Sequence, residues 1–346
     1  MVSRFCSACW PNASPIRCSS RVPAFSRRRV LRNWLLASTG LQAELLGRQS
    51  LERAIARRIQ EGKAGSLVAY QRLLQQDQAE QQQLIEALVV GESWFLREPR
   101  SFAQLVELSG RERQRPLRVL SCGCSGGEEP YSVVIALLEA GIPLQQLEVE
   151  AIDISGVALA RAAEGLYSSH SLRGMDPRLL ARYFDPEGRR WRLRPEIREA
   201  VRFHQGTLQE RLATLPPGWN AVFCRNVMLY LHDQARLDLL MTIAERLAPA
   251  GLLLVAAAEA ALVPTTRYQR LIGGHGSGFA LSSAEREASP EAGSAGGRRR
   301  ALPPGLDGAS PGTVSPGGSA WQPGSLAAGR GSFPSPAGPG AGARDP

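Results

Sequence analysis

The segment Leu117-Arg-Val-Leu-Ser-Cys-Gly-Cys-Ser-Gly-Gly-Glu-Glu-Pro-Tyr-Ser132 decides the fold. Its first five residues form a short apolar run that predicts a buried strand, and Pro130 is typical of the first turn of a helix. The glycines at 123, 126 and 127 lie between them, where they let a ligand approach the backbone. N–H groups at a helix start also favour a polar or negatively charged ligand group. The segment therefore predicts a strand, a ligand-binding loop and a helix in succession.

The residues around the glycines narrow the choice of ligand. The loop lacks the G-x-G-x-x-G spacing of dinucleotide-binding proteins, and the acids Glu128 and Glu129 would repel a pyrophosphate. Asp153, thirty residues past Gly123, ends the next apolar run, where an acid can bind both hydroxyls of a ribose. Taken alone, Asp153 could equally only cap the next helix. An adenosine with a sulfonium in place of phosphate fits all three features, so S-adenosylmethionine is the expected cofactor.

Strand-like and helical segments alternate on both sides of this loop. Such alternation predicts an α/β fold with a parallel sheet covered by helices on both faces. The expected strands are 117–121, 147–152, 220–224 and 251–258, and the expected helices are 130–140, 157–163 and 235–247.

The composition changes along the chain and divides it into four parts. Glycines punctuate short helical patterns before residue 90, and a charged, proline-containing stretch at about 168–201 has the character of an insertion. The two ends cannot bury enough apolar surface to fold. We expect a disordered extension at 1–29, a helical domain at 30–90, an α/β domain at 91–284 and a disordered Gly/Pro-rich tail at 285–346.

The composition also excludes several classes of protein. Hydrophobic residues make up 43% of the 346 residues, and no apolar run approaches the ~20 residues that span a bilayer. The net charge is +9, but residues 1–30 carry +6 and residues 284–346 carry +1. The remaining +2 is weak support for a nucleic-acid partner, so none is expected. The cysteines fit neither a disulfide framework nor a metal site, and a reduced, cytoplasmic protein is expected.

Four motifs, the glycine loop among them, make the chain resemble the CheR-type protein-glutamate O-methyltransferases of bacterial chemosensory systems. The resemblance covers roughly residues 30–282, and the biofilm-signalling WspC branch is the nearest in character. It implies a class I S-adenosylmethionine-dependent, Rossmann-like methyltransferase sheet, a small N-terminal helical domain and a small β-subdomain as the insertion. The motifs are Gly91-Glu-Ser-Trp-Phe-Leu-Arg-Glu-Pro99, Ser-Gly-Gly-Glu-Glu-Pro-Tyr-Ser132, Ala-Ile-Asp-Ile-Ser155 and Phe223-Cys-Arg-Asn-Val-Met-Leu-Tyr230.

The resemblance also implies roles for individual residues. Asp153 would hold the ribose, and Glu129 would meet the positively charged amino end of the methionine moiety. Arg225 and Asn226 would line the adenosine pocket, and Arg97 would lie in the active-site cleft. The implied cofactor-binding set also includes Arg97 and is completed by Ser93, Gly123, Thr207 and Leu208.

The expected chemistry is methyl transfer to a glutamate side chain. A glutamate has an ordinary pKa of about 4.3, so at pH 7 it is already the nucleophile and needs no general base. Catalysis then depends mainly on orienting the carboxylate. Arg97 is the candidate for that task, because a guanidinium can bind a carboxylate through two hydrogen bonds. Tyr230 is the candidate donor or packing wall beside it, and no metal is expected.

Two departures from the family pattern leave a second reading open. Gly91 and Thr207 each stand where the family has Asn, and each loses an amide that could donate to the cofactor. One such hydrogen bond contributes roughly 0.5–1.5 kcal/mol, which weakens binding without abolishing it. The alternative is therefore a catalytically weak or inactive paralogue that binds receptor or cofactor without turnover.

The expected partner is the cytoplasmic helical bundle of a chemoreceptor, met by a monomeric enzyme. Arg53 and Arg57 lie four residues apart on one predicted helix and would share a face, which suits an acidic helix. A solvated face without a partner is the alternative. Some relatives hold the receptor's C-terminal pentapeptide as an added strand of the β-subdomain. Only Asp185-Pro-Glu-Gly188 is available here for that loop, so no dependence on such a tether is expected.

Overall fold

The computed structural model describes residues 24–47, 49–89, 91–112, 116–271 and 278–282. The chain forms two compact units, which divide between Leu84 and Ile85. The expected tail at 285–346 and most of the expected extension at 1–29 lie outside the described residues. The first helix, α1, begins at Ala24, six residues before the expected start of the helical domain.

The N-terminal unit is built from helices, as its sequence periodicity predicts. They are α1 (Ala24–Thr39), α2 (Ser50–Arg58), α3 (Leu67–Gln76) and α4 (Gln78–Glu86), with a π-helical turn at Ile59–Lys63 after α2. Gly62 in this turn has a φ of 80°, which ends the helix because only glycine adopts this conformation without strain. The core of the unit includes Leu35, Tyr70 and Leu74, all buried.

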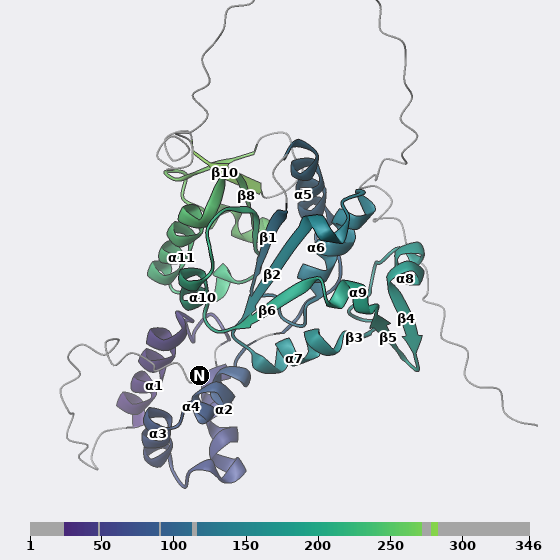
Figure 1. The fold of residues 1–346 in the computed structure, drawn as a ribbon. Helices are drawn as coiled ribbons and strands as arrows, with labels where there is room; N and C mark the ends of the chain where they lie inside the picture. Colours follow the sequence, from purple (N-terminus) through teal and green to yellow (C-terminus); the bar gives the residue numbers. More distant parts are fainter. Residues whose placement is uncertain (1–23, 48, 90, 113–115, 272–277, 283–346) are drawn as a thin grey trace, which may run out of the picture. The chain divides into compact units, whose positions relative to one another are not determined.

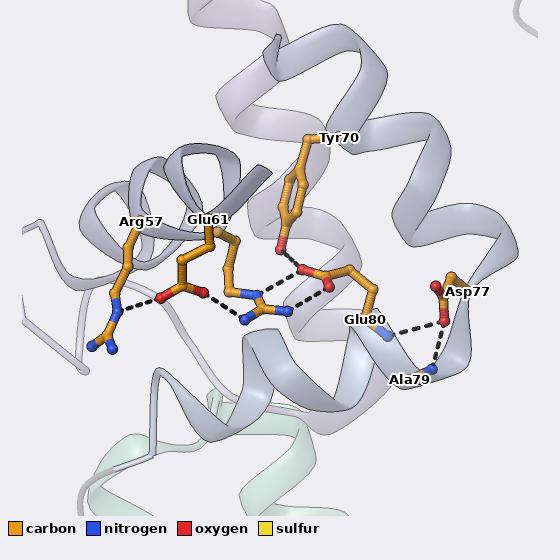
Figure 2. Close-up of polar contacts among 7 residues, drawn as sticks. Arg57, Glu61, Tyr70, Asp77, Ala79 and Glu80 are labelled. Carbon is orange, nitrogen blue, oxygen red and sulfur yellow. Dashed lines mark hydrogen bonds and ion pairs between the residues drawn. The ribbon is translucent and has the colours of Figure 1, made fainter. Parts of the chain in front are cut away.

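A buried ion pair crosses this helical core. The Arg58 guanidinium donates two hydrogen bonds to the Glu80 carboxylate, at 2.8 and 2.6 Å, and the Tyr70 hydroxyl adds a third at 2.8 Å. Figure 2 shows these contacts beside Asp77, whose carboxylate accepts from the first amides of α4. Because all three side chains are nearly inaccessible to water, the network fixes how α2, α3 and α4 pack.

The second unit contains a seven-stranded sheet in the order β6-β2-β1-β7-β8-β10-β9 (Figure 1). The first five strands in this order are parallel, whereas β10 is antiparallel to both β8 and β9. The sheet is therefore mixed rather than wholly parallel. Its strands are β1 (Leu117–Cys122), β2 (Leu147–Asp153), β6 (Val201–Gln205), β7 (Trp219–Cys224), β8 (Leu247–Leu254), β9 (Tyr268–Arg270) and β10 (Gly278–Leu281).

Helices cover both faces of this sheet. In Figure 1, α5 and α6 lie on one face, and α10 and α11 lie on the other. The central strand β7 is buried along its whole length, as expected for a strand enclosed by two helical layers. The helices are α5 (Pro99–Arg111), α6 (Glu128–Glu139), α7 (Gly156–Glu164), α10 (Leu208–Thr214) and α11 (Asp233–Arg246).

A small three-stranded antiparallel sheet is inserted between α7 and β6. Its order is β3-β5-β4, with the strands β3 (Leu166–Ser168), β4 (Phe184–Glu187) and β5 (Arg190–Leu193), and the short helices α8 (Pro177–Tyr183) and α9 (Pro195–Arg198) flank it. The β4–β5 connection is a two-residue turn at Gly188 and Arg189, shorter than the loop suggested by the sequence. Pro186 is tolerated in β4 because β4 is an edge strand.

Candidate active site at the carboxyl edge of the sheet

The parallel strands end together at one edge of the large sheet. Cys122 of β1 pairs with Ile152 of β2 and with Cys224 of β7, and Asp153 pairs with Gln205 of β6. The loops that follow these four strands therefore meet at the same edge. The predicted site residues Gly123, Asp153, Thr207, Arg225 and Asn226 all lie in or beside those loops. Ligands of open α/β sheets bind at this edge.

The glycine loop between β1 and α6 leaves no space for larger residues. Gly123 has a φ of 76°, and a Cβ atom at this position would lie 2.3 Å from a Val227 methyl group. Gly126 is fixed from the other side, because its carbonyl accepts a 2.7 Å hydrogen bond from the buried Tyr167 hydroxyl of β3. The buried Ser125 Oγ has no hydrogen-bond partner among the described residues. A free polar atom in a glycine-lined loop fits the binding of a polar ligand.

Asp153 organises this loop rather than the helix after it. Its two carboxylate oxygens accept from the Ser125 amide at 2.7 Å and from the Ser155 amide at 2.9 Å. The N-cap of α7 is Ser155, whose hydroxyl accepts from the Ala158 amide. The carboxylate keeps acceptor capacity for a further donor, which is compatible with a ribose. Burial raises the pKa of Asp153 above its ordinary value, although the two amides act in the opposite direction.

Glu129 and Arg225, expected to have separate roles, form a buried ion pair. Arg225 Nη1 donates to Glu129 Oε2 at 3.0 Å, and the Ser121 hydroxyl donates to Glu129 Oε1 at 2.7 Å. Burial raises the pKa of Glu129 despite the neighbouring guanidinium. Only 2% of the Arg225 side chain is exposed, so Arg225 holds the end of β7 against the start of α6.

Arg97 lies on the segment that precedes α5, and Arg225 also reaches this segment. Arg225 Nη2 donates to the Arg97 carbonyl at 2.5 Å. The residues on either side of Arg97, Leu96 and Glu98, have left-handed φ values of 55° and 56°. Non-glycine residues in this region carry strain of about 1–3 kcal/mol each, and such strain clusters at functional sites. In the described part of the chain, no carboxylate is within ion-pair distance of the Arg97 side chain.

A buried carboxylate that the sequence analysis missed, Glu259, shapes the loop after β7. It accepts from the Asn226 amide at 2.7 Å and from the Leu229 amide at 3.3 Å. Asn226 itself has a left-handed φ of 59°, which these hydrogen bonds help to maintain. Burial raises the pKa of Glu259. The available signal was a single acid in the otherwise apolar run 252–263.

The other predicted residues have local roles in the structure. The Thr207 hydroxyl forms a capping box with Glu210 and starts α10 at Leu208. Tyr230 ends a 3-10 turn and is partly exposed, as is Ser93. The Cys122 and Cys124 thiols are buried and free, and burial raises the pKa of both, which fits loop filling rather than nucleophilic chemistry.

The two predicted docking residues of the N-terminal unit differ in their surroundings. The exposed Arg53 donates only to the Gln49 carbonyl, at 3.3 Å, within the part of the chain that is described. Arg57 forms a 2.9 Å ion pair with Glu61, as Figure 2 shows. Arg58, which the sequence places beside them, is committed to the buried pair with Glu80.

The described residues contain neither a candidate membrane span nor a candidate metal cluster. No helix there is both long and apolar enough to cross a bilayer. No group of three His, Cys, Asp or Glu side chains in the same part of the chain could hold a metal ion.

The sheet order, the glycine loop and the acid after the second strand together define a class I methyltransferase fold. Residues 91–274 match the family profile described as CheR methyltransferase, SAM binding domain, and residues 29–89 match its all-alpha domain. The chain belongs to the CheR methyltransferase family, and the fold, family and cofactor predicted from the motifs are confirmed.

Curated relatives extend this assignment. The "Probable biofilm formation methyltransferase WspC" of Pseudomonas putida is 35% identical over 257 residues, which cover 72% of this chain and 60% of that protein. Its counterpart from Pseudomonas aeruginosa is 36% identical over 66% of this chain and 56% of that protein. "Chemotaxis protein methyltransferase 2" of Vibrio cholerae is 34% identical over 66% of this chain and 83% of that protein. The match thus spans less than two thirds of the WspC proteins.

Proposed function

We propose that this protein transfers the methyl group of S-adenosylmethionine to glutamate side chains of a chemoreceptor or related sensory protein, in chemotaxis or biofilm signalling. The observation that carries the proposal is the environment of the Arg97 side chain. Its guanidinium has no carboxylate partner among the described residues, and its backbone is tied by Arg225 to Glu129 at the start of α6. A fixed guanidinium without an acidic partner at this edge suits a carboxylate substrate.

The residues of the glycine loop fit the cofactor. The Asp153 carboxylate would bind the ribose, and the remaining lone pairs of Glu129 would accept from the amino group of the methionine moiety. Ser93, Thr207, Leu208 and Asn226 complete the proposed pocket. Bound S-adenosylmethionine supplies an electrophilic methyl group, whose transfer to a carboxylate oxygen leaves neutral S-adenosylhomocysteine and needs no proton transfer.

The task left to the chain is to orient the substrate. Arg97 would hold one glutamate by two charge-assisted hydrogen bonds and aim its oxygen at the methyl carbon. Tyr230 would form the adjacent wall. Positioning of this kind can account for a large share of a rate enhancement when the reacting groups are held in contact. We further propose that the protein acts as a monomer in the cytoplasm and does not bind nucleic acid.

The direct test is methylation of a sensory protein's helical domain with methyl-labelled S-adenosylmethionine. Labelled methanol released by mild alkali identifies a carboxyl methyl ester. Arg97→Gln should lose most of this activity while S-adenosylhomocysteine still binds. Label that resists alkali would contradict glutamate O-methylation.

The second candidate function is binding without turnover, and the residues at 91 and 207 favour it. Gly91 has no side chain, and the Thr207 hydroxyl is already used in the capping box with Glu210. Calorimetric titration with S-adenosylhomocysteine separates the two readings. An absence of binding at millimolar ligand would exclude the enzyme, whereas binding without methylation of any sensory protein would favour the module.

A further inference from the structure

The half-buried Trp94 of the methyltransferase unit contacts two arginines. The Arg97 guanidinium carbon lies 4.3 Å from the Trp94 ring centroid, and that of Arg173 lies 3.8 Å from it. Both guanidinium groups are therefore within cation–π distance of the same indole. Because each lies about 4 Å from the ring, their centres are at most about 8 Å apart.

The two arginines come from separate segments that are joined through the backbone. Arg97 follows Trp94 in the segment before α5, and Arg173 lies in the turn between β3 and α8. The Phe95 amide donates to the Ser171 carbonyl at 2.8 Å, so the two segments are held in register. The Phe95 ring is buried edge-on against Tyr167 and Phe184. The spacing of the guanidinium groups is therefore set before any substrate arrives.

Both guanidinium groups keep donors for a ligand. The Arg97 side chain donates to the Glu92 carbonyl at a long 3.3 Å. Arg173 donates to the His170 carbonyl and forms a 3.5 Å ion pair with Glu92, whose side chain is 66% exposed. A guanidinium has five N–H groups, and an exposed ion pair of this kind contributes only about 0–1 kcal/mol. Stacking on an indole leaves the guanidinium edges open to carboxylates.

We infer that Arg97 and Arg173 bind two carboxylates one helical turn apart on the sensory protein, with Trp94 as the positioning residue. This inference rests on the proposed function and adds a recognition element to it. Arg97 holds the glutamate to be methylated, and Arg173 binds an acidic residue next to it. Side chains three or four residues apart on a helix have Cβ atoms about 5–6 Å apart. Two glutamates at this spacing can splay to reach both guanidinium groups.

The inference can be tested by binding alone. Two labelled helical peptides are compared, one with Glu at two positions four residues apart and one with the second Glu replaced by Gln. Arg173→Gln should weaken binding of the two-acid peptide roughly fivefold to tenfold and leave the one-acid peptide unchanged. Arg178→Gln is the matched control, because Arg178 is also exposed and loses the same charge. Equal effects of Arg173→Gln and Arg178→Gln on the two-acid peptide would overturn the inference.

Trp94 is tested by conservative replacement. Trp94→Phe keeps an aromatic face and should preserve most of the preference for the two-acid peptide, whereas Trp94→Leu should abolish that preference. If Trp94→Leu still prefers the two-acid peptide, Trp94 does not position the two arginines.

The same variants separate this inference from the proposed function. If the protein prefers the two-acid peptide but transfers no methyl group, the inferred recognition element is supported and the enzymatic proposal is contradicted. Methyl transfer that is indifferent to the second acid and to Arg173 would do the reverse.

Discussion

Arg225 Nη1 lies 3.0 Å from Glu129 Oε2, and this buried pair joins the end of β7 to the start of α6. Removing one partner of a buried pair leaves the other charge uncompensated, which costs about 3–5 kcal/mol. We therefore expect Arg225→Gln to lower the free energy of unfolding by that order, as measured by denaturant titration at pH 7. Glu129→Gln with Arg225→Met should recover part of the loss, and no recovery would mean that the charge is not its cause.

The cost of Arg225→Gln should depend on pH. Burial already raises the pKa of Glu129 above its ordinary value, and loss of Arg225 removes the charge that opposes this rise. A carboxyl with a raised pKa in the folded state contributes stability below its unfolded pKa, and this stability is lost as pH rises through the folded pKa. The difference between parent and variant should therefore be small near pH 4 and grow toward neutral pH. If the difference in the free energy of unfolding between parent and variant is constant over this pH range, the Glu129 charge is not the cause of the cost.

Cofactor affinity should depend on the ionisation of Asp153. Replacement by Asn removes charge-assisted hydrogen bonds to the ribose, each worth roughly 1.5–3 kcal/mol, so S-adenosylhomocysteine should bind at least about tenfold more weakly. Because burial raises the pKa of Asp153, parent affinity should fall as pH drops through that pKa, while Asp153→Asn stays flat. Calorimetric titrations of both proteins at several pH values test this. Unchanged S-adenosylhomocysteine affinity in Asp153→Asn would contradict the placement of the ribose at Asp153.

The docking face of the N-terminal unit should depend more on Arg53 than on Arg57. Glu61 partly neutralises Arg57, whereas in the described region no carboxylate lies within ion-pair distance of Arg53. At low ionic strength, where steering is strongest, Arg53→Glu should reduce the methylation rate more than Arg57→Glu does. S-adenosylhomocysteine affinity serves as the control and should not change. If neither variant changes the methylation rate, Arg53 and Arg57 lie on a solvated face without a partner.

Receptor recognition should not require a C-terminal tether. The two-residue turn between β4 and β5 leaves no extended loop to hold an added strand. Methylation of a cognate receptor should therefore proceed at a similar rate with and without its last five residues. A large drop on truncation would show that the small sheet does bind them.

The Arg58–Glu80 pair should stabilise the helical unit alone. Glu80→Gln leaves the Arg58 charge buried and should cost about 3–5 kcal/mol, whereas Tyr70→Phe removes one hydrogen bond to a charged group and should cost about 1.5–3 kcal/mol. Thermal unfolding followed by circular dichroism ranks the two variants. Both should bind S-adenosylhomocysteine as the parent does.

The strands predicted from the sequence were those enclosed by helices on both faces. β1 and β7 read as mainly apolar runs because both sides of each strand are buried, whereas in β2 two glutamates alternate with apolar residues. The strand β6 escaped prediction because it is an edge strand whose outer residues, including Arg202 and His204, are polar. The strands β9 and β10 are too short to show a period.

For the candidate site, the sequence predicted which residues lie close together but not which hydrogen bonds and ion pairs they form. The edge of the sheet that collects Gly123, Asp153 and Arg225 follows from the order of strands and loops. The pairing of Arg225 with Glu129 joins residues 96 positions apart, and no local spacing encodes it. The sequence did not reveal the importance of Glu259 either, because two of its partners are the backbone amides of Asn226 and Leu229, which lie 33 and 30 residues upstream.

The hydrogen bond from the Tyr167 hydroxyl to the Gly126 carbonyl bears on how this family can diversify. β3 belongs to the inserted sheet, yet its tyrosine supports the loop that would hold the cofactor. The inserted sheet therefore cannot be replaced without affecting the glycine loop. A chimaera that imports the small sheet of a relative would keep its glycine loop in place only if the donor supplies an equivalent tyrosine, so sequence change in the insertion is constrained by the loop that it supports.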